Sequence, residues 1–102
     1  MNQAAHDPNL VGKRLEIIRL AKDIGTQPQF AKILNVSKNR YNNWATGGVL
    51  IPVEYAVRIK ELTGATLEYI YLGDRSSLPL SLAQSIQRAE ASSSPSDIGS
   101  AG

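Results

Sequence analysis

Three asparagines and two basic residues gather in one short segment of the chain. They are Lys38, Asn39, Arg40, Asn42 and Asn43. The segment is expected to be helical, with Tyr41 and Trp44, three positions apart, facing the core. Asparagine is a poor helix former because its side chain competes for backbone hydrogen bonds, and a helix chosen for stability alone would carry Glu, Lys, Gln or Ala. The exposed amides therefore indicate a hydrogen-bonding surface, with chance variation on an exposed face as the alternative.

The chain has few residues that could form disulfides, bind a metal ion or act in catalysis. The 102 residues include no cysteine and a single histidine, His6, in a polar leader. This excludes disulfides and thiolate metal sites, and it leaves no metal centre or catalytic triad based on histidine. No nucleophile–base pair or phosphate-binding loop is found either, so we expect neither an enzyme nor a cofactor. Without a run of about 18 apolar residues or a signal-peptide pattern, we expect a soluble, cytoplasmic protein.

Positive charge is concentrated in the N-terminal half of the sequence. The net charge is only +2, but from Lys13 to Arg40 seven basic residues face two acidic ones, Glu16 and Asp23. Such a distribution favours one anion-facing surface. A solvated basic helix face explains the charge equally well.

The spacing of apolar residues predicts an all-α, compact five-helix bundle with helices over residues 10–24, 27–34, 38–46, 52–63 and 67–72. Gly25 is expected to end the first helix, and Asn35 to take the left-handed conformation in the sharp turn before the third. The expected inward-facing residues include Leu10, Phe30, Ala31, Leu34, Ala56, Ile59, Leu62 and Ile70.

The two ends of the chain differ in composition from its centre. We expect a flexible leader over residues 1–9, a helical domain over 10–74, an extra C-terminal helix over 75–91 and a disordered tail over 92–102. Ser81 and Gln84 form a candidate capping box for the extra helix. This helix could serve as a dimer contact or a packing strap, or the segment could be disordered. We expect no second domain that would bind a small-molecule effector.

Residues 26–47, TQPQFAKILNVSKNRYNNWATG, resemble the lambda-repressor-like (Cro and Xre type) helix-turn-helix DNA-binding family. The resemblance continues through IPVEYAVRIKELTGATLEYIYLGD and covers about residues 10–74. The matching positions are Gln27, Ala31, Val36, Ser37, Tyr41, Trp44 and Gly47. The chain departs from the family pattern at Pro28, at Asn35 in place of the usual turn glycine, and at Ala45 in place of a frequent acidic residue.

The resemblance implies that the third helix enters the major groove of double-stranded DNA, where each base pair presents a distinct hydrogen-bonding pattern. The implied base-reading residues are Ser37, Lys38, Asn39, Asn42, Asn43 and Thr46. The implied phosphate-binding residues are Gln27, Arg40, Lys32, Lys13, Arg14 and Arg19. Arg14 and Arg19 could equally pair with Glu16 and Asp23 within the first helix.

The expected function is therefore that of a sequence-specific transcriptional regulator, a repressor that binds an inverted-repeat operator as a homodimer. An antitoxin that represses its own operon would have the same features. The alternative in a different class is a protein-interaction adaptor on a helix-turn-helix scaffold. An adaptor would more often expose an apolar patch on the third helix.

Overall fold

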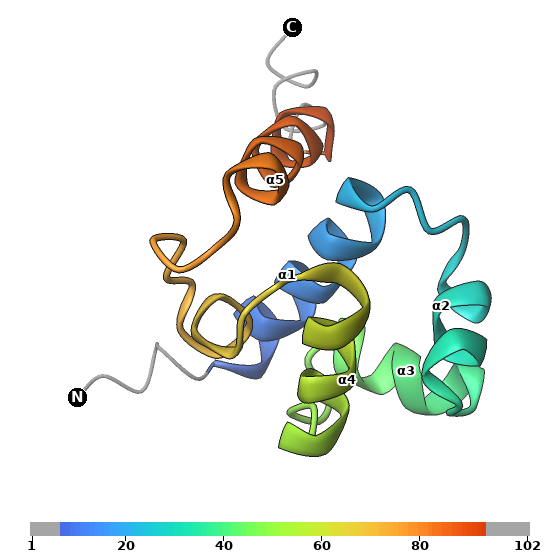
Figure 1. Ribbon diagram of the computed structural model, residues 1–102. Helices are drawn as coiled ribbons and strands as arrows, with labels where there is room; N and C mark the ends of the chain where they lie inside the picture. The colour runs from blue at the N-terminus through green and yellow to red at the C-terminus, as the bar shows by residue number, and fades with distance from the viewer. Residues whose placement is uncertain (1–6, 94–102) are drawn as a thin grey trace, which may run out of the picture.

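The computed structural model describes residues 7–93, and within this range the chain forms helices joined by turns, with no strand (Figure 1). The elements are α1 (Pro8–Ala21), α2 (Gln27–Leu34), α3 (Lys38–Ala45), α4 (Val53–Thr63), η2 (Glu68–Leu72) and α5 (Leu80–Ser93). The segment η2 is a single turn of π-helix. The all-α prediction is confirmed for the described residues, and the additional C-terminal helix is present as α5.

Helix α1 runs through the middle of the molecule and packs against α3, η2 and α5 (Figure 1). It begins at Pro8, inside the expected leader, because the Asp7 side chain caps its first turn by accepting a hydrogen bond from the Asn9 backbone N–H at 2.8 Å. It ends at Ala21 rather than near residue 24, because the left-handed backbone of Asp23 (φ 57°) already reverses the chain. The prediction that Gly25 ends this helix was therefore wrong.

The boundaries of α2 and α3 follow local capping signals. Thr26 and Gln29 form a reciprocal capping box at the start of α2, which satisfies two backbone N–H groups. Asn35 takes the left-handed conformation (φ 63°), as predicted, and Ser37 caps α3 by accepting from the Arg40 backbone N–H at 3.0 Å. These caps fix a turn of three residues between the two helices.

The core is formed mainly by the predicted apolar faces. Its largest fully buried side chains are Trp44, Tyr41, Tyr69, Phe30, Leu15 and Ile18. Two predicted core residues are exposed instead, Leu10 at 38% and Leu62 at 52%. In α4 the inward face is continued by Thr63, whose hydroxyl donates to the Ile59 carbonyl at 2.7 Å, so the helix turns Leu62 outward.

Helix α5 is a packing strap over α1, with Leu82, Ile86 and Ala89 buried on its inner face. It starts at Leu80, and the Ala83 N–H already bonds the Pro79 carbonyl at 2.9 Å, so Ser81 lies inside the helix and the predicted capping box is wrong. Residues 92 and 93 of the predicted tail are helical. His6, the rest of the expected leader (residues 1–6) and the rest of the tail (residues 94–102) lie outside the described residues.

Within residues 7–93, no helix is both long and apolar enough to cross a membrane.

Candidate nucleic-acid interface

The outward face of α3 is polar from end to end. In a helix, Asn39, the neighbouring Asn42 and Asn43, and Thr46 share one face because they are three or four positions apart. All four are exposed, and Lys38 lies one turn before Asn42. The structure thus brings the predicted base-reading residues together on one surface.

The two hydroxyl residues at the ends of this face also have structural roles. Ser37 caps the first turn of α3, and the Thr46 hydroxyl donates to the Asn42 carbonyl at 2.8 Å. Each hydroxyl uses one hydrogen-bonding function within the helix and keeps another for a ligand. They border the asparagine face rather than lie at its centre.

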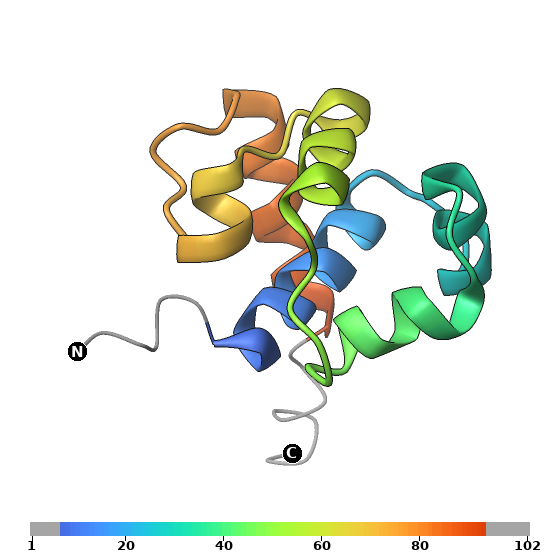
Figure 2. The same ribbon diagram turned by 90° about the horizontal axis from the view of Figure 1, so that it is seen from below.

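One flank of α3 lies directly against the backbone of α1, and Figure 2 shows the end of α3 beside α1. Gly12 makes this approach possible, because a Cβ at that position would lie 2.5 Å from the carbonyl oxygens of Trp44 and Ala45. Such a short distance leaves no room for any side chain. The absence of a side chain at residue 12 therefore fixes how closely α3 lies against α1.

A part-buried carboxylate, Glu16, joins three elements around the site. It accepts a hydrogen bond from the Tyr41 hydroxyl at 2.7 Å and pairs with the Arg19 guanidinium at 2.9 Å. Burial alone would raise the pKa of Glu16, but hydrogen bonds from Arg19, Gln27 and Tyr41 outweigh it and hold the pKa below its ordinary value. Burial and the Glu16 carboxylate raise the pKa of Tyr41. Glu16 thus stays charged at neutral pH and ties α1 to α3 and to the start of α2.

Apart from its three-residue spacing to Arg19, Glu16 has no feature in the sequence that predicts this role. The long-range partner, Tyr41, is 25 residues away. A tyrosine at a core position of α3 is the one available signal, because a buried hydroxyl needs a partner.

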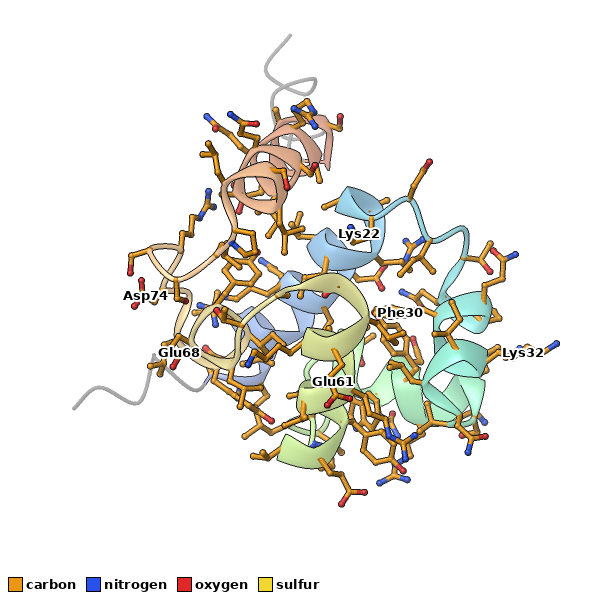
Figure 3. The ribbon with its side chains drawn as sticks, viewed as in Figure 1. Lys22, Phe30, Lys32, Glu61, Glu68 and Asp74 are labelled. Atoms are coloured by element: carbon orange, nitrogen blue, oxygen red, sulfur yellow. The ribbon has the colours of Figure 1, made fainter. Side chains whose placement is uncertain are left out.

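Two of the predicted phosphate-binding residues lie at α2. Gln27 is its first residue, half-buried beside Glu16. Lys32 is exposed, and Figure 3 shows its side chain pointing away from the body of the molecule, whereas Phe30 from the same helix points inward. Lys13 is exposed on α1. These side chains keep donors that a ligand could use.

Arg14 and Arg19 are used inside the protein instead. Arg19 pairs with Glu16 and donates to the carbonyls of Ile24 and Gly25 at 3.2 and 2.6 Å, which holds the turn after α1. Arg14 donates to the Ile70 carbonyl of η2 at 3.1 Å, and its burial lowers its pKa. Both arginines thus use part of their hydrogen-bond donors within the protein, and their contacts with phosphate remain a prediction.

Arg40 lies on the other flank of α3, towards α4. Its guanidinium is 5.5 Å from the Trp44 ring centre and 4.9 Å from that of Tyr55. Arg58 of α4 stacks on the same Tyr55 ring at 5.1 Å and donates to the Leu34 carbonyl at 3.1 Å. Arg58 is not among the residues predicted from the sequence, where its only local signal is its spacing of three residues from Tyr55.

An apolar groove lies beyond the end of α3. It has a volume of about 520 Å³ and runs between the start of α4 and η2. Its lining includes Leu50, Pro52, Val53, Leu67, Tyr71 and Leu72. No three His, Cys, Asp or Glu side chains in the described part of the chain come together as a metal ion would require.

Comparisons with family models, with curated proteins and with solved structures give no match to this chain. The interpretation of the site therefore depends on its own residues and their geometry.

Proposed function

We propose that this protein is a sequence-specific DNA-binding regulator that acts as a repressor. The observation that carries the proposal is the exposed face of α3, where Asn39, Asn42 and Asn43 lie together with Lys38 at one end. Behind this face, Tyr41 and Trp44 are buried, so the helix is held rigidly while its amides face solvent. A regulator of this kind would act in the cytoplasm, on double-stranded DNA.

The chemistry of the face matches the major groove. Asparagine can bond the adenine N6 and N7 positions bidentately, and lysine can donate to guanine O6 and N7. The first turn of α2, with Gln27 and exposed backbone N–H groups, would contact a backbone phosphate. In this arrangement α3 would contact the bases, and α2 would position the protein on the DNA backbone.

The length of α3 supports a homodimer. The eight residues of α3 span about 12 Å, which reaches only a few base pairs. Two copies on half-sites about one helical turn apart would give the specificity that an operator needs. We assign the apolar groove to the second copy, because residues 50–53 directly follow the turn that ends α3 and Val53 at its rim is 59% exposed.

The same groove favours the second candidate function, a protein-interaction adaptor or antitoxin-type partner. In that case another protein would fill the groove, and the face of α3 would not contact DNA. The polar face of α3 argues against an adaptor, since the apolar surface lies at α4 and η2 and not on α3.

Selection from a random pool of DNA duplexes tests the proposal directly. Purified protein would be used at about 0.15 M salt, close to physiological ionic strength, and the bound duplexes would be sequenced after several rounds. Enrichment of an inverted repeat with adenines in each half-site is the expected result. An Asn42→Ala/Asn43→Ala double variant is the matched control, which should fold normally and lose the enrichment. A folded wild-type protein that enriches no sequence would overturn the proposal and favour the adaptor.

A further inference from the structure

Two guanidinium groups share one aromatic ring beside the candidate interface. Arg40 from α3 and Arg58 from α4 each lie about 5 Å from the ring centre of Tyr55. Their charges are therefore no more than about 10 Å apart. Both arginines are exposed. Two positive charges on one small surface raise the local potential and attract an anion.

No carboxylate in the described part of the chain is within ion-pair distance of these two arginines. The ion pairs among residues 7–93 are Arg19 with Glu16 and Arg75 with Glu90. Glu54 and Glu61 lie four positions before and three positions after Arg58 on α4, and neither is within ion-pair distance of it. Within residues 7–93, neither Arg40 nor Arg58 forms an ion pair.

Stacking on Tyr55 also restricts the motion of the two arginine side chains before a ligand binds. A guanidinium held against an aromatic face has lost part of its rotational freedom, while its N–H groups remain available at the edge. Arg58 uses one N–H group on the Leu34 carbonyl, which anchors it at the end of α2. The remaining N–H groups have the planar arrangement that binds phosphate oxygens bidentately.

The position of the cluster relative to α3 indicates which anion it would meet. The end of α3 meets α1 through the backbone carbonyl of Ala45, and Gln27 contacts Glu16 of the same helix α1. Arg40 stacks on Tyr55 and thus lies on the side of α3 that faces α4, not α1. A helix in the major groove has one sugar–phosphate backbone on each side, so the two flanks face different strands.

We propose that Arg40 and Arg58 together grip a backbone phosphate of the DNA strand opposite to the one contacted by Gln27. This inference rests on the proposed function and adds Arg58 to the interface. Tyr55 acts as the positioning residue for both arginines.

The test is the salt dependence of binding to the selected duplex, measured for wild type, Arg58→Gln, Arg58→Lys and Lys60→Gln. Each phosphate contact adds about 0.9 to the slope of log affinity against log salt. We expect Arg58→Gln to lower the slope by about 1 and to weaken binding about tenfold. Arg58→Lys should keep the slope. Lys60→Gln, which removes the same charge from another side of α4, should leave slope and affinity unchanged.

A purely structural role for Arg58 gives a different pattern. Loss of its bond to Leu34 would lower the thermal midpoint and the affinity of Arg58→Gln without changing the slope, and that result would overturn the inference. If wild type binds the duplex and Arg58→Gln matches Lys60→Gln, the inference fails while the proposed function stands. If wild type binds no duplex at all, both fail.

Discussion

The hydroxyl of Tyr41 donates a 2.7 Å hydrogen bond to the carboxylate of Glu16, across 25 residues of sequence. Tyr41 lies on α3 and is buried in the protein core, and Glu16 is on α1 next to the start of α2. The same carboxylate also pairs with Arg19, which in turn holds the turn after α1 through the carbonyls of Ile24 and Gly25. One charged group thus sets the relative positions of the helix that would read bases and the helix end that would contact phosphate.

Replacement of Glu16 by Gln should destabilise the protein by about 1–3 kcal/mol at pH 7, because a charged acceptor of several hydrogen bonds is lost. Since the pKa of Glu16 is lowered in the folded state, its contribution is fully present above the ordinary Glu pKa of about 4.3 and is lost as the pH falls through the folded value. The difference between wild type and variant should therefore shrink below about pH 4. Urea unfolding between pH 3 and 7 measures this. Glu61→Gln, at an exposed position, is the control and should stay within about 0.5 kcal/mol of wild type.

Gly12 provides a test of the close approach between α1 and α3. Gly12→Ala places a Cβ against the carbonyls of Trp44 and Ala45, so the two helices must separate, and we expect a loss of about 1–3 kcal/mol. Gly48→Ala is the control, because its Cβ would be 3.5 Å from the nearest atom, an ordinary contact distance. Equal thermal midpoints for the two variants would contradict this account of the α1–α3 contact.

Local signals explain which parts of the fold could be predicted from sequence. The ends of α2 and α3 depend on side chains that bond their own backbone, such as Thr26 and Ser37, and these predictions agree with the structure. The end of α1 depends on the left-handed backbone of Asp23, and Arg19 holds the following turn through the Ile24 carbonyl. Ser81 matched a capping pattern, but the helix already starts at Leu80.

The sequence predicts which side chains of the candidate site are exposed. It does not predict which side chains form hydrogen bonds to residues distant in the sequence. The asparagines of α3 are exposed because Tyr41 and Trp44 occupy the inward positions, which the spacing shows. The roles of Arg14 and Arg19 depend on carbonyl groups brought near by folding, at Ile70 and Gly25. Charge in a sequence gives no information about such long-range partners, so the sequence could not show that both arginines use part of their hydrogen-bond donors within the protein.

Asn42 and Asn43 should determine the preference of the protein for the selected DNA sequence. Alanine at either position should weaken binding to the selected duplex by about 1–3 kcal/mol and have much less effect on a random duplex. Gln87→Ala, an exposed amide on α5, should change neither affinity. Fluorescence anisotropy titrations on both duplexes measure the difference, and equal losses on both would exclude base reading by these residues.

Lys32 should contribute affinity without specificity. Lys32→Gln should weaken binding to selected and random duplexes alike and reduce the salt slope by about 1, because one phosphate contact is lost. Lys22, at the far end of α1 in Figure 3, is also exposed, and Lys22→Gln is the control with the wild-type slope. If Lys32→Gln keeps the wild-type slope, Lys32 does not contact a phosphate.

Val53 tests whether the groove joins two copies of the chain. A glutamate at this rim position would bring an unpaired charge into an apolar contact, which is costly, so the dimer dissociation constant should rise at least about tenfold. Leu80→Glu is the control, because Leu80 is 74% exposed on α5, outside the groove. Sedimentation velocity of both variants and wild type, with and without the selected duplex, gives the oligomeric state. A wild-type dimer that persists in Val53→Glu would place the dimer contact elsewhere, and a wild-type monomer on the duplex would remove the homodimer from the proposal.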